Sequence, residues 1–372
     1  MSRLSELIEE LCPDGVEYKP LSECAVLPSI PKGLKRNQYE TSGSYPIVDQ
    51  GKGQIAGFTC DETKLVRDVP GIVFGDHTRE IKYVDYIFVP GADGVKWIRA
   101  VDGVSIRYLF HCLASLSIPS RGYNRHWILV REMLIPVPPL EVQREIVRIL
   151  DQFTALEAEL EAELEARRTQ YEHYRNHLLS YESLADCGPV SLVPLRECIE
   201  LCYGERITKT QHAGTLYPVY GGGGASFMTD SFNRADEFVI SRFALSEACV
   251  RFVSGEFWLL DSGITFNVNE LCCDKRYVGQ FLLSRQNDIY RRSAGAAQRN
   301  LKIAEFLSME VPLPGLAEQR RIADLLDRFD ALINDISSGL PAEIAARRAQ
   351  YEHYRDRLLS FPEKAVSGSD AS

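Results

Sequence analysis

The sequence lacks the apolar stretches that membrane insertion and secretion require. None of its hydrophobic runs approaches the roughly 18 to 20 residues that span a bilayer. The first residues, MSRLSELIEELCPDG, carry acidic side chains where a signal peptide has a cationic and then an apolar segment. We therefore expect a cytoplasmic protein that makes no contact with a membrane.

Paired cysteines and metal-ligand clusters are also missing. Ten cysteines occur, but none are spaced as Cys-x-x-Cys, and neither the adjacent pair Cys272-Cys273 nor the Cys198/Cys202 spacing has a second pair or a nearby histidine. Zinc sites are built from such pairs. We expect reduced, mostly buried thiols and no metal site.

The motifs of nucleotide-binding and methyl-transferring enzymes are absent. No GxxxxGK[ST] loop and no Asn/Asp-Pro-Pro-aromatic tetrad occurs. The fragment nearest to a dinucleotide fingerprint, Gly51 to Ala56, reads as a turn because no periodic helix follows it. Carboxylates and histidines form no spacing that specifies acid–base or nucleophilic chemistry. We expect recognition rather than catalysis, and no cofactor bound by this chain.

The net charge of −10 argues against a nucleic-acid partner until it is divided by segment. Residues 14–130 hold 14 Lys/Arg and 13 Asp/Glu, and residues 185–308 hold 13 and 14. The excess acid lies in 132–184 and 309–372, with 5 against 11 and 8 against 11. The two intervening segments are close to neutral, which allows a locally basic face on each.

One stretch occurs twice. Arg167 to Tyr181 reads RRTQYEHYRNHLLSY and Arg347 to Phe361 reads RRAQYEHYRDRLLSF, with eleven of fifteen positions identical. Shorter fragments also return, because Pro20-Leu-Ser-Glu-Cys24 matches Pro194-Leu-Arg-Glu-Cys198. The chain is therefore an internal duplication in which each half is a globular segment followed by a long helix.

This plan gives expected boundaries for each part of the chain. They are an N-terminal helix at 1–13, a globular domain at 14–135 (domain 1), a helical region at 136–184, a second globular domain at 185–311 (domain 2), a helical region at 312–362 and a disordered tail at 363–372. Short apolar runs broken by Gly, Pro and Asp predict a mixed, α+β class. In domain 1 they predict strands at Tyr45–Val48, Gly71–Phe74, Tyr86–Val89, Val95–Ile98 and Trp127–Val130, and a helix at Ile106–Ser115.

Each long helix begins after a group of prolines. Pro139 and Pro314 end these groups, and proline is tolerated at a helix start but not inside a helix. Leu140 to about Tyr181 carries apolar residues at spacings of three and four, which predicts a rod of roughly 60 Å. The second rod has four extra residues around Gly339-Leu340-Pro341, where we expect a break. The two stripes predict an antiparallel coiled-coil pair with pseudo-two-fold symmetry, and two ordinary core helices are the alternative.

Taken together, the duplicated halves, the Gln143-Arg144 and Gln319-Arg320 helix entries and the repeated RRxQYEHYR segments closely resemble the specificity subunit of type I restriction-modification systems. The resemblance covers essentially the whole chain. It implies that each globular domain reads one half of an asymmetric, bipartite site in double-stranded DNA, and that the helices act as a spacer. It also implies two adenine-methylating modification subunits bound to the helices, and restriction subunits that join the assembly. S-adenosylmethionine, ATP and Mg²⁺ are then expected in those partners.

Candidate DNA contacts in domain 1 gather in polar loops. A Gly-punctuated loop offers side chains that can read bases or hold phosphate, with a purely structural role in fixing the loop as the equal alternative. A second polar tip and a basic cluster suited to phosphates complete the set. The residues are Arg121, Tyr123, Asn124, Arg125 and His126 in the loop, His77 and Arg79 at the tip, and Lys32, Lys35 and Arg36 in the cluster.

Domain 2 has a corresponding basic and amide-bearing stretch before its helix entry, and Arg242 is a weaker candidate. The stretch contains Arg291, Arg292, Gln298, Arg299, Asn300 and Lys302. The Gly221–Gly224 run permits a close backbone approach to phosphate, although a flexible turn is favoured.

The repeated segments are the expected docking sites for two identical partners. Their shared residues are Arg167, Arg168, Tyr171, Tyr174, Arg175 and Leu178 in the first copy, and Arg347, Arg348, Tyr351, Tyr354, Arg355 and Leu358 in the second. We therefore predict a non-catalytic DNA-specificity subunit. A structural scaffold that reads no DNA, and an orphan regulatory paralogue that binds modification subunits, are the alternatives.

Overall fold

The computed structural model describes residues 3–91, 93–120, 122, 124–243, 245–295, 299–334 and 340–364. It divides into two compact units. Unit 1 combines the chain up to Leu160 with the residues from Ile344 on, and unit 2 is Glu161–Glu343. Both units mix helices with short-stranded sheets, which confirms the α+β class.

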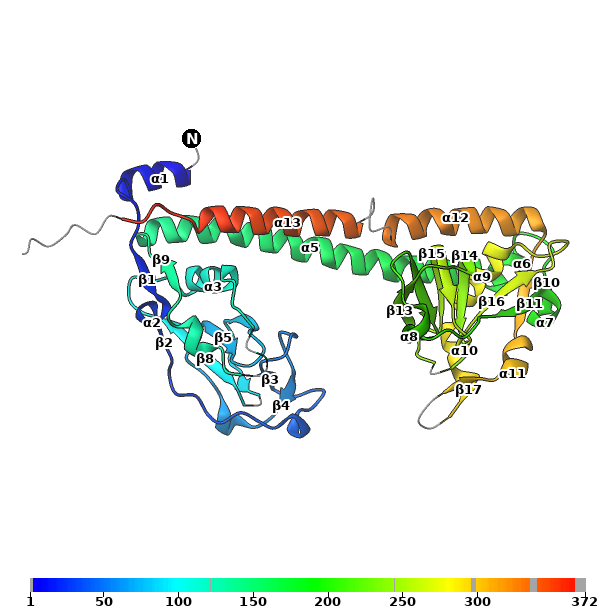
Figure 1. Ribbon diagram of the computed structural model, residues 1–372, viewed down its shortest axis with the longest axis horizontal. Coiled ribbons are helices and arrows are strands. Elements are labelled where there is room, and N and C mark those ends of the chain that lie inside the picture. The colour runs from blue at the N-terminus through cyan, green and yellow to red at the C-terminus, as the bar shows by residue number, and fades with distance from the viewer. Residues whose placement is uncertain are drawn as a thin grey trace, which may run out of the picture. The chain divides into compact units, whose positions relative to one another are not determined.

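Unit 1 contains domain 1 and three small sheets (Figure 1). The strands are β1 (Tyr18–Pro20), β2 (Ala25–Val26), β3 (Tyr45–Val48), β4 (Gly57–Thr59), β5 (Gly71–Gly75), β6 (Ile81–Val84), β7 (Val89–Pro90), β8 (Val95–Ala100) and β9 (Leu134–Pro136). They form the sheets β2-β8-β5-β6, β4-β3-β7 and β1-β9. The shorter helices are α1 (Arg3–Leu11), α2 (Leu21–Cys24), α3 (Ile106–Ser115) and α4 (Trp127–Val130), with 3-10 turns η1 (Arg36–Gln38) and η2 (Glu62–Lys64).

Unit 2 contains domain 2, in which one larger sheet dominates. The strands are β10 (Ser191–Pro194), β11 (Ile199–Tyr203), β12 (Tyr217–Gly221), β13 (Gly224–Thr229), β14 (Arg234–Ser241), β15 (Val250–Leu259), β16 (Gly263–Val268), β17 (Ser293–Ala294), β18 (Asn300–Leu301) and β19 (Glu310–Leu313). The sheets are β11-β16-β14-β15-β12-β13, β10-β19 and β17-β18. The shorter helices are α6 (Tyr181–Ala185), α7 (Leu195–Cys198), α8 (Lys209–His212), α9 (Lys275–Ser284), α10 (Gln286–Arg291) and α11 (Ile303–Leu307).

The two domains share one strand plan. The order β2-β8-β5-β6 in domain 1 matches β11-β16-β14-β15 in domain 2, and β4-β3-β7 matches β13-β12-β15. Each plan contains one parallel pair, β3 with β7 and β12 with β15. The single strand β15 therefore takes the positions of both β6 and β7. As a result, the two sheets of domain 1 correspond to one continuous sheet in domain 2.

Buried polar contacts repeat between the halves at the helix entries. Gln143 and Gln319 are fully buried near the starts of α5 (Leu140–Leu178) and α12 (Leu316–Asn334). Gln143 accepts from the N–H of Ser105 at 2.8 Å and donates to two carbonyls. Gln319 makes the same set of bonds, accepting from the N–H of Asp274 at 2.9 Å. The duplication therefore extends to individual hydrogen bonds.

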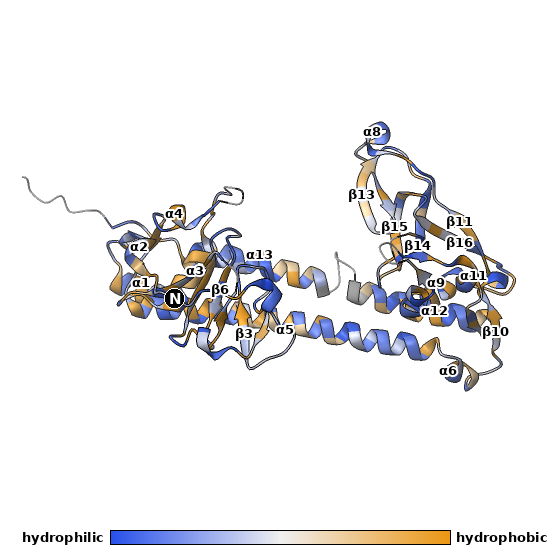
Figure 2. Ribbon diagram, turned by 90° about the horizontal axis from the view of Figure 1, so that it is seen from below, coloured by the Kyte–Doolittle hydropathy of each residue, from blue (hydrophilic) through white to orange (hydrophobic). Residues whose placement is uncertain are grey.

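The long helices begin where the prolines predict. The second helical region is divided into α12 and α13 (Leu340–Leu358). Of the predicted break, Gly339 lies outside the described residues, whereas Leu340 and Pro341 begin α13. Figure 2 shows α5 and α12 as predominantly hydrophilic with interspersed hydrophobic residues. Most of their surface is therefore not part of a core.

Within unit 1, α5 and α13 lie side by side and antiparallel. The Phe153 ring of α5 stacks on Tyr354 at 5.4 Å and lies 6.5 Å from Tyr351. Further along α5, Glu157 forms an ion pair with Arg348. Residue numbers along α13 therefore decrease as those along α5 increase. The two helices are antiparallel in this segment, as predicted. A coiled coil over the full length of the helices stays a prediction.

The two ends of the described chain are joined by backbone bonds. Val16 N–H donates to the carbonyl of Pro362 at 2.8 Å, and Lys364 N–H donates to the carbonyl of Val16 at 3.0 Å. Gly15 has a φ of +90°, and a Cβ there would lie 2.4 Å from the Pro362 oxygen. The C-terminal segment therefore pairs with the N-terminal part of unit 1.

Two of the predicted strands of domain 1 need correction. Trp127–Val130 is the short helix α4, because four apolar residues do not distinguish a strand from a buried helical turn. Tyr86–Val89 is mostly loop, and β7 begins only at Val89. The sequence interpretation also missed β6, in which Lys82 interrupts the apolar pattern.

Candidate nucleic-acid interface

Four polar loops meet at one end of domain 1. Thr78 in the β5–β6 turn donates from its hydroxyl to the Gln50 carbonyl, 2.6 Å away in the loop after β3. Asp76 N–H donates to the carbonyl of Gly94 between β7 and β8 at 2.8 Å. His126 N–H, before α4, donates to the Asp76 carbonyl at 2.8 Å. The two polar regions predicted separately, 75–79 and 121–126, thus form one cluster.

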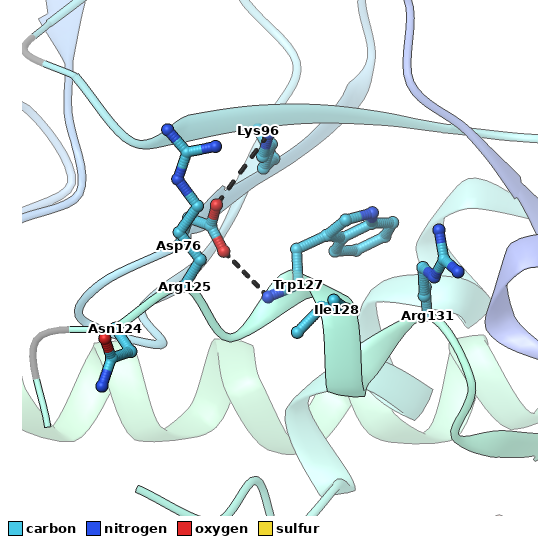
Figure 3. Close-up of a pocket in the computed structure, with 7 residues that line it drawn as sticks. All are labelled: Asp76, Lys96, Asn124, Arg125, Trp127, Ile128 and Arg131. Atoms are coloured by element: carbon cyan, nitrogen blue, oxygen red, sulfur yellow. Dashed lines mark hydrogen bonds and ion pairs between the residues drawn. The ribbon is translucent and has the colours of Figure 1, made fainter. Parts of the chain in front are cut away.

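Asp76 is the centre of that cluster (Figure 3). Its side chain is 1% exposed, its Oδ1 accepts from the N–H of Trp127 at 2.8 Å, and its Oδ2 lies 3.9 Å from Lys96 Nζ. The imidazole of His126 is fully buried and donates through Nδ1 to the Asp76 carbonyl at 2.9 Å. His126 therefore fixes the loop to its own domain, which corrects its prediction as a DNA contact.

A basin of about 580 Å³ opens beside Asp76. Its lining residues are Asp76, Lys96, Asn124, Arg125, Trp127, Ile128 and Arg131. Asn124, Arg125 and Ile128 are exposed. The lining includes three cationic side chains and one carboxylate, an arrangement suited to an anion such as DNA phosphate. Sequence reasoning missed Lys96 and Arg131, because a lone cation in a strand or after an apolar run carries no signal of the loop beside it.

The other candidates of domain 1 lie around this cluster or apart from it. Lys32, Lys35 and Arg36 are exposed on the long connection from β2 to β3. Arg79 has a φ of +68° and donates from its guanidinium to the Ile118 carbonyl at 2.9 Å. His77 is half-buried, and its N–H donates to Gln50 Oε1 at 3.3 Å. Arg121 and Tyr123 lie outside the described residues.

Domain 2 builds the same loop cluster. Arg242 N–H donates to the carbonyl of Ser262 at 2.9 Å, and Leu301 N–H donates to the carbonyl of Arg242 at 2.9 Å. Gly222 accepts from the hydroxyl of Ser241 at 2.6 Å and donates to Ser262 Oγ at 3.2 Å. The Gly221–Gly224 run is therefore a hairpin turn held by side chains, and not a flexible turn.

A cation lies under the loop in each domain, buried in domain 1 and half-buried in domain 2. Lys82 Nζ donates to the carbonyls of Asp49 at 2.7 Å and Gly53 at 2.6 Å. Arg251 donates from Nη2 to the carbonyl of Gly222 at 2.6 Å. Both occupy the equivalent register position in their strand pairs, and burial lowers the pKa of each. These positioning residues were missed because only the fold reveals their burial.

The basic stretch of domain 2 separates into structural and exposed residues. The Arg299 guanidinium donates to Ser293 Oγ and to the Ser293 carbonyl, each at 2.8 Å, and its plane lies 4.6 Å from the Tyr290 ring centroid. Arg299 therefore holds the two strands β17 and β18 together. This structural role replaces the DNA contact that was predicted for Arg299. Arg291 and Asn300 are exposed.

Two further residues of this stretch, Arg292 and Lys302, contact Glu305 of α11. Arg292 donates from Nη1 to the Glu305 carbonyl at 3.3 Å, and Lys302 pairs with the Glu305 carboxylate at 2.8 Å. Gln298 lies outside the described residues. The Lys302 side chain is 49% exposed, so its contact with DNA stays a prediction.

The first tyrosine of each repeated segment packs against its own unit. Tyr171 is 6% exposed and donates from its hydroxyl to Gln280 Oε1 at 3.5 Å. Tyr351 is half-buried, and its hydroxyl lies 3.3 Å from His111 Nδ1. The burial of Tyr171 corrects its prediction as a docking residue, whereas docking through Tyr351 stays a prediction.

The rest of the repeated segments divide in nearly the same way in both copies. Tyr174 and Tyr354 are 48% and 37% exposed. The other exposed residues are Arg167, Arg168 and Arg348, and the half-buried residues are Arg347, Arg175, Arg355, Leu178 and Leu358. The exposed residues are therefore the main candidates for docking a partner.

The contact at Tyr351 predicts a pH effect on unit 1. His111 Nε2 lies 3.1 Å from Asp151 Oδ1, and Arg107 and Arg355 are nearby. Burial lowers the pKa of His111 below its ordinary value of 6.5, the two arginines act in the same direction, and Asp151 opposes them. The unfolded chain then binds a proton that the native state does not, so the stability of unit 1 should fall as the pH drops below about 6.5.

We expect His111→Gln, which copies Gln280 of unit 2, to remove this part of the pH dependence. Urea unfolding at pH 7.5 and 5.5 measures it in a Trp258→Phe background, where Trp97 and Trp127 both report on unit 1. The exposed His353→Gln is the matched control. Equal pH slopes for His111→Gln and the parent would contradict the assignment.

Neither a membrane span nor a metal site is found in the part of the chain that the structure describes. No helix there combines the length and apolarity needed to cross a bilayer. No group of three His, Cys, Asp or Glu side chains there is placed to hold a metal ion.

Comparisons with known proteins agree with these features. A model of the family described as type I restriction modification DNA specificity domain matches residues 14–166 and 225–346. The specificity subunit of the Escherichia coli type I restriction enzymes EcoR124I/EcoR124II is 29% identical, with 97% of this chain and 98% of that protein covered. A putative type I restriction enzyme specificity subunit of Haemophilus influenzae is 28% identical, with 93% and 96% covered.

Two solved structures share the fold. The type I restriction-modification S subunit from M. genitalium matches with a TM-score of 0.58 at 15% identity, covering 93% of this chain and 96% of that one. A chain from work on complex assembly and conformational transition of the type I R-M system matches with a TM-score of 0.53 at 16% identity, covering 94% and 98%. With most of its length matched by the family model, the chain belongs to the type I restriction-modification DNA specificity family.

Proposed function

We propose that this chain is the DNA sequence-specificity subunit of a type I restriction-modification complex. Each domain reads one half of an asymmetric, bipartite site, and the helices set the distance between the halves. The observation that carries the proposal is the pair of loop clusters, which have the same backbone bonds but different side chains. A constant frame with different contacting groups is what reading two different half-sites requires.

The chain itself carries no catalytic centre in this proposal. Two adenine methyltransferase subunits dock on the exposed members of the repeated segments, chiefly Tyr174 and Tyr354 with Arg167, Arg168 and Arg348. Restriction subunits join through that complex, which works in the cytoplasm. S-adenosylmethionine, ATP and Mg²⁺ belong to those partners. Support comes from the family and from the E. coli relative, which is a specificity subunit.

Reconstitution with the methyltransferase subunits of its own system tests this function. We expect N6-methyladenine at a split, asymmetric motif across a genome, with two half-sites at a fixed spacing. Methylation that is random or absent would favour a scaffold that joins proteins without reading DNA. A double substitution of Tyr174 and Tyr354 by alanine should weaken assembly, and exposed Tyr181→Ala is its control.

A further inference from the structure

Asp76 and Arg242 occupy the same position in the two domains. Each follows directly after an equivalent strand, β5 or β14. The N–H of Asp76 donates to Gly94 and that of Arg242 to Ser262, at 2.8 and 2.9 Å. The carbonyl of each accepts an N–H from the segment that leads into the last short helix of its domain, at 2.8 and 2.9 Å. This shared position thus carries an acidic residue in domain 1 and a basic residue in domain 2.

The carboxylate of Asp76 makes its contacts within its own domain. It is 1% exposed, accepts the N–H of Trp127 and lies beside Lys96 Nζ. A buried carboxylate of this kind holds the loop around it, and a DNA base cannot reach it. In domain 1 the position therefore shapes the cluster, and reading is left to exposed neighbours such as Asn124 and Arg125.

The guanidinium of Arg242 is arranged differently. It lies 5.0 Å from the ring centroid of Tyr203 and 4.6 Å from that of Phe243, and the residue is half-buried. Contact with ring faces holds the planar group without occupying the N–H donors along its edge. Because the side chain is already ordered, less conformational entropy is lost when those donors bind a ligand.

We infer that Arg242 is a specificity-determining residue of domain 2, which donates two parallel hydrogen bonds to guanine O6 and N7 in the major groove. This geometry matches the fork of arginine donors. Asp76 is the positioning residue at the equivalent place in domain 1. The inference rests on the proposed function, because it names the group through which domain 2 reads its half-site. A phosphate offers similar acceptors, so the test must separate a base from the DNA backbone.

The experiment compares the methylation motif of the reconstituted complex with that of Arg242→Ala and Arg242→Lys. We expect both variants to lose a guanine preference at one position of a single half-site, with discrimination there falling about 10- to 100-fold. Lysine keeps the positive charge but lacks the planar fork of donors, so its failure to restore the preference separates the geometry of the guanidinium from its charge. Arg196→Ala, an exposed arginine on α7, is the matched control.

The results that would overturn the inference are distinct from failure of the proposed function. Unchanged base preferences in Arg242→Ala, including weaker methylation that is uniform across all sites, would indicate a phosphate contact or none. Asp76→Asn keeps an acceptor for the Trp127 N–H and should leave every base preference unchanged. A changed base preference in that variant would remove the positioning role. If the unmodified protein directs no motif, the proposed function itself fails.

Discussion

Replacement of Gln143 by leucine should lower the free energy of unfolding of unit 1 by about 3 kcal/mol or more. The side chain is fully buried and bonds to the Ser105 N–H and to the carbonyls of Gly103 and Pro138. Leucine leaves these three backbone groups without partners, and each such group costs about 1–3 kcal/mol. Urea unfolding of the Trp258→Phe background, in which the remaining tryptophans report on unit 1, provides the measurement.

Two further substitutions give this prediction its controls. Gln152→Leu makes the same chemical change at an exposed position of α5 within unit 1 and should cost well under 1 kcal/mol. Gln319→Leu should destabilise unit 2 by a similar amount, because its three bonds repeat those of Gln143. A loss below about 1 kcal/mol for Gln143→Leu would show that water or a local shift replaces the missing bonds.

Deletion of Leu160 to Glu163 should change the spacer of the recognised DNA site and leave both half-sites intact. Four residues shorten α5 by about 6 Å and turn the chain that follows by about 40°. A 6 Å change corresponds to nearly two base-pair steps of about 3.4 Å. The methylation motif of the reconstituted complex should therefore keep its bases and lose one or two positions from its spacer.

A variant of unchanged length tests whether the effect comes from length. Glu161→Gln with Glu163→Gln removes the charges of the same turn without shortening the helix, so its motif should match that of the parent. An unchanged spacer after the deletion would end the idea that α5 measures the distance. New bases in either half-site would mean instead that the deletion disturbs a domain.

The helices and the duplication could be predicted because their signals are local. The prolines before Leu140 determine where α5 begins, and the repeated RRxQYEHYR segment identifies the halves without knowledge of the fold. The repeat could not show that Tyr171 and Tyr351 pack against their own units, because a recurring residue fits a shared internal contact as well as a shared surface. Their partners, Gln280 and His111, lie more than a hundred residues away in the sequence.

The candidate interface was predictable only in part, for a related reason. The loops around Asp76 and His126 were identified as polar tips, but the bond between them joins residues fifty positions apart. That bond decides that His126 is buried while Asn124 and Arg125 remain exposed. Lys82 gave no signal, because a cation within an apolar pattern looks the same whether its ammonium group lies in water or donates to two carbonyls of its own domain.

The backbone bonds between Val16 and the C-terminal segment affect the order in which the two units complete their folding. Unit 2 is continuous in the chain, so all of its residues are synthesised before residues 344–364. Unit 1 begins first, but Tyr351 and Pro362, which contact it, are synthesised after unit 2. Domains usually complete folding from the N-terminus during synthesis. Here the domain that is synthesised first acquires its last contacts only after all of unit 2 has been synthesised.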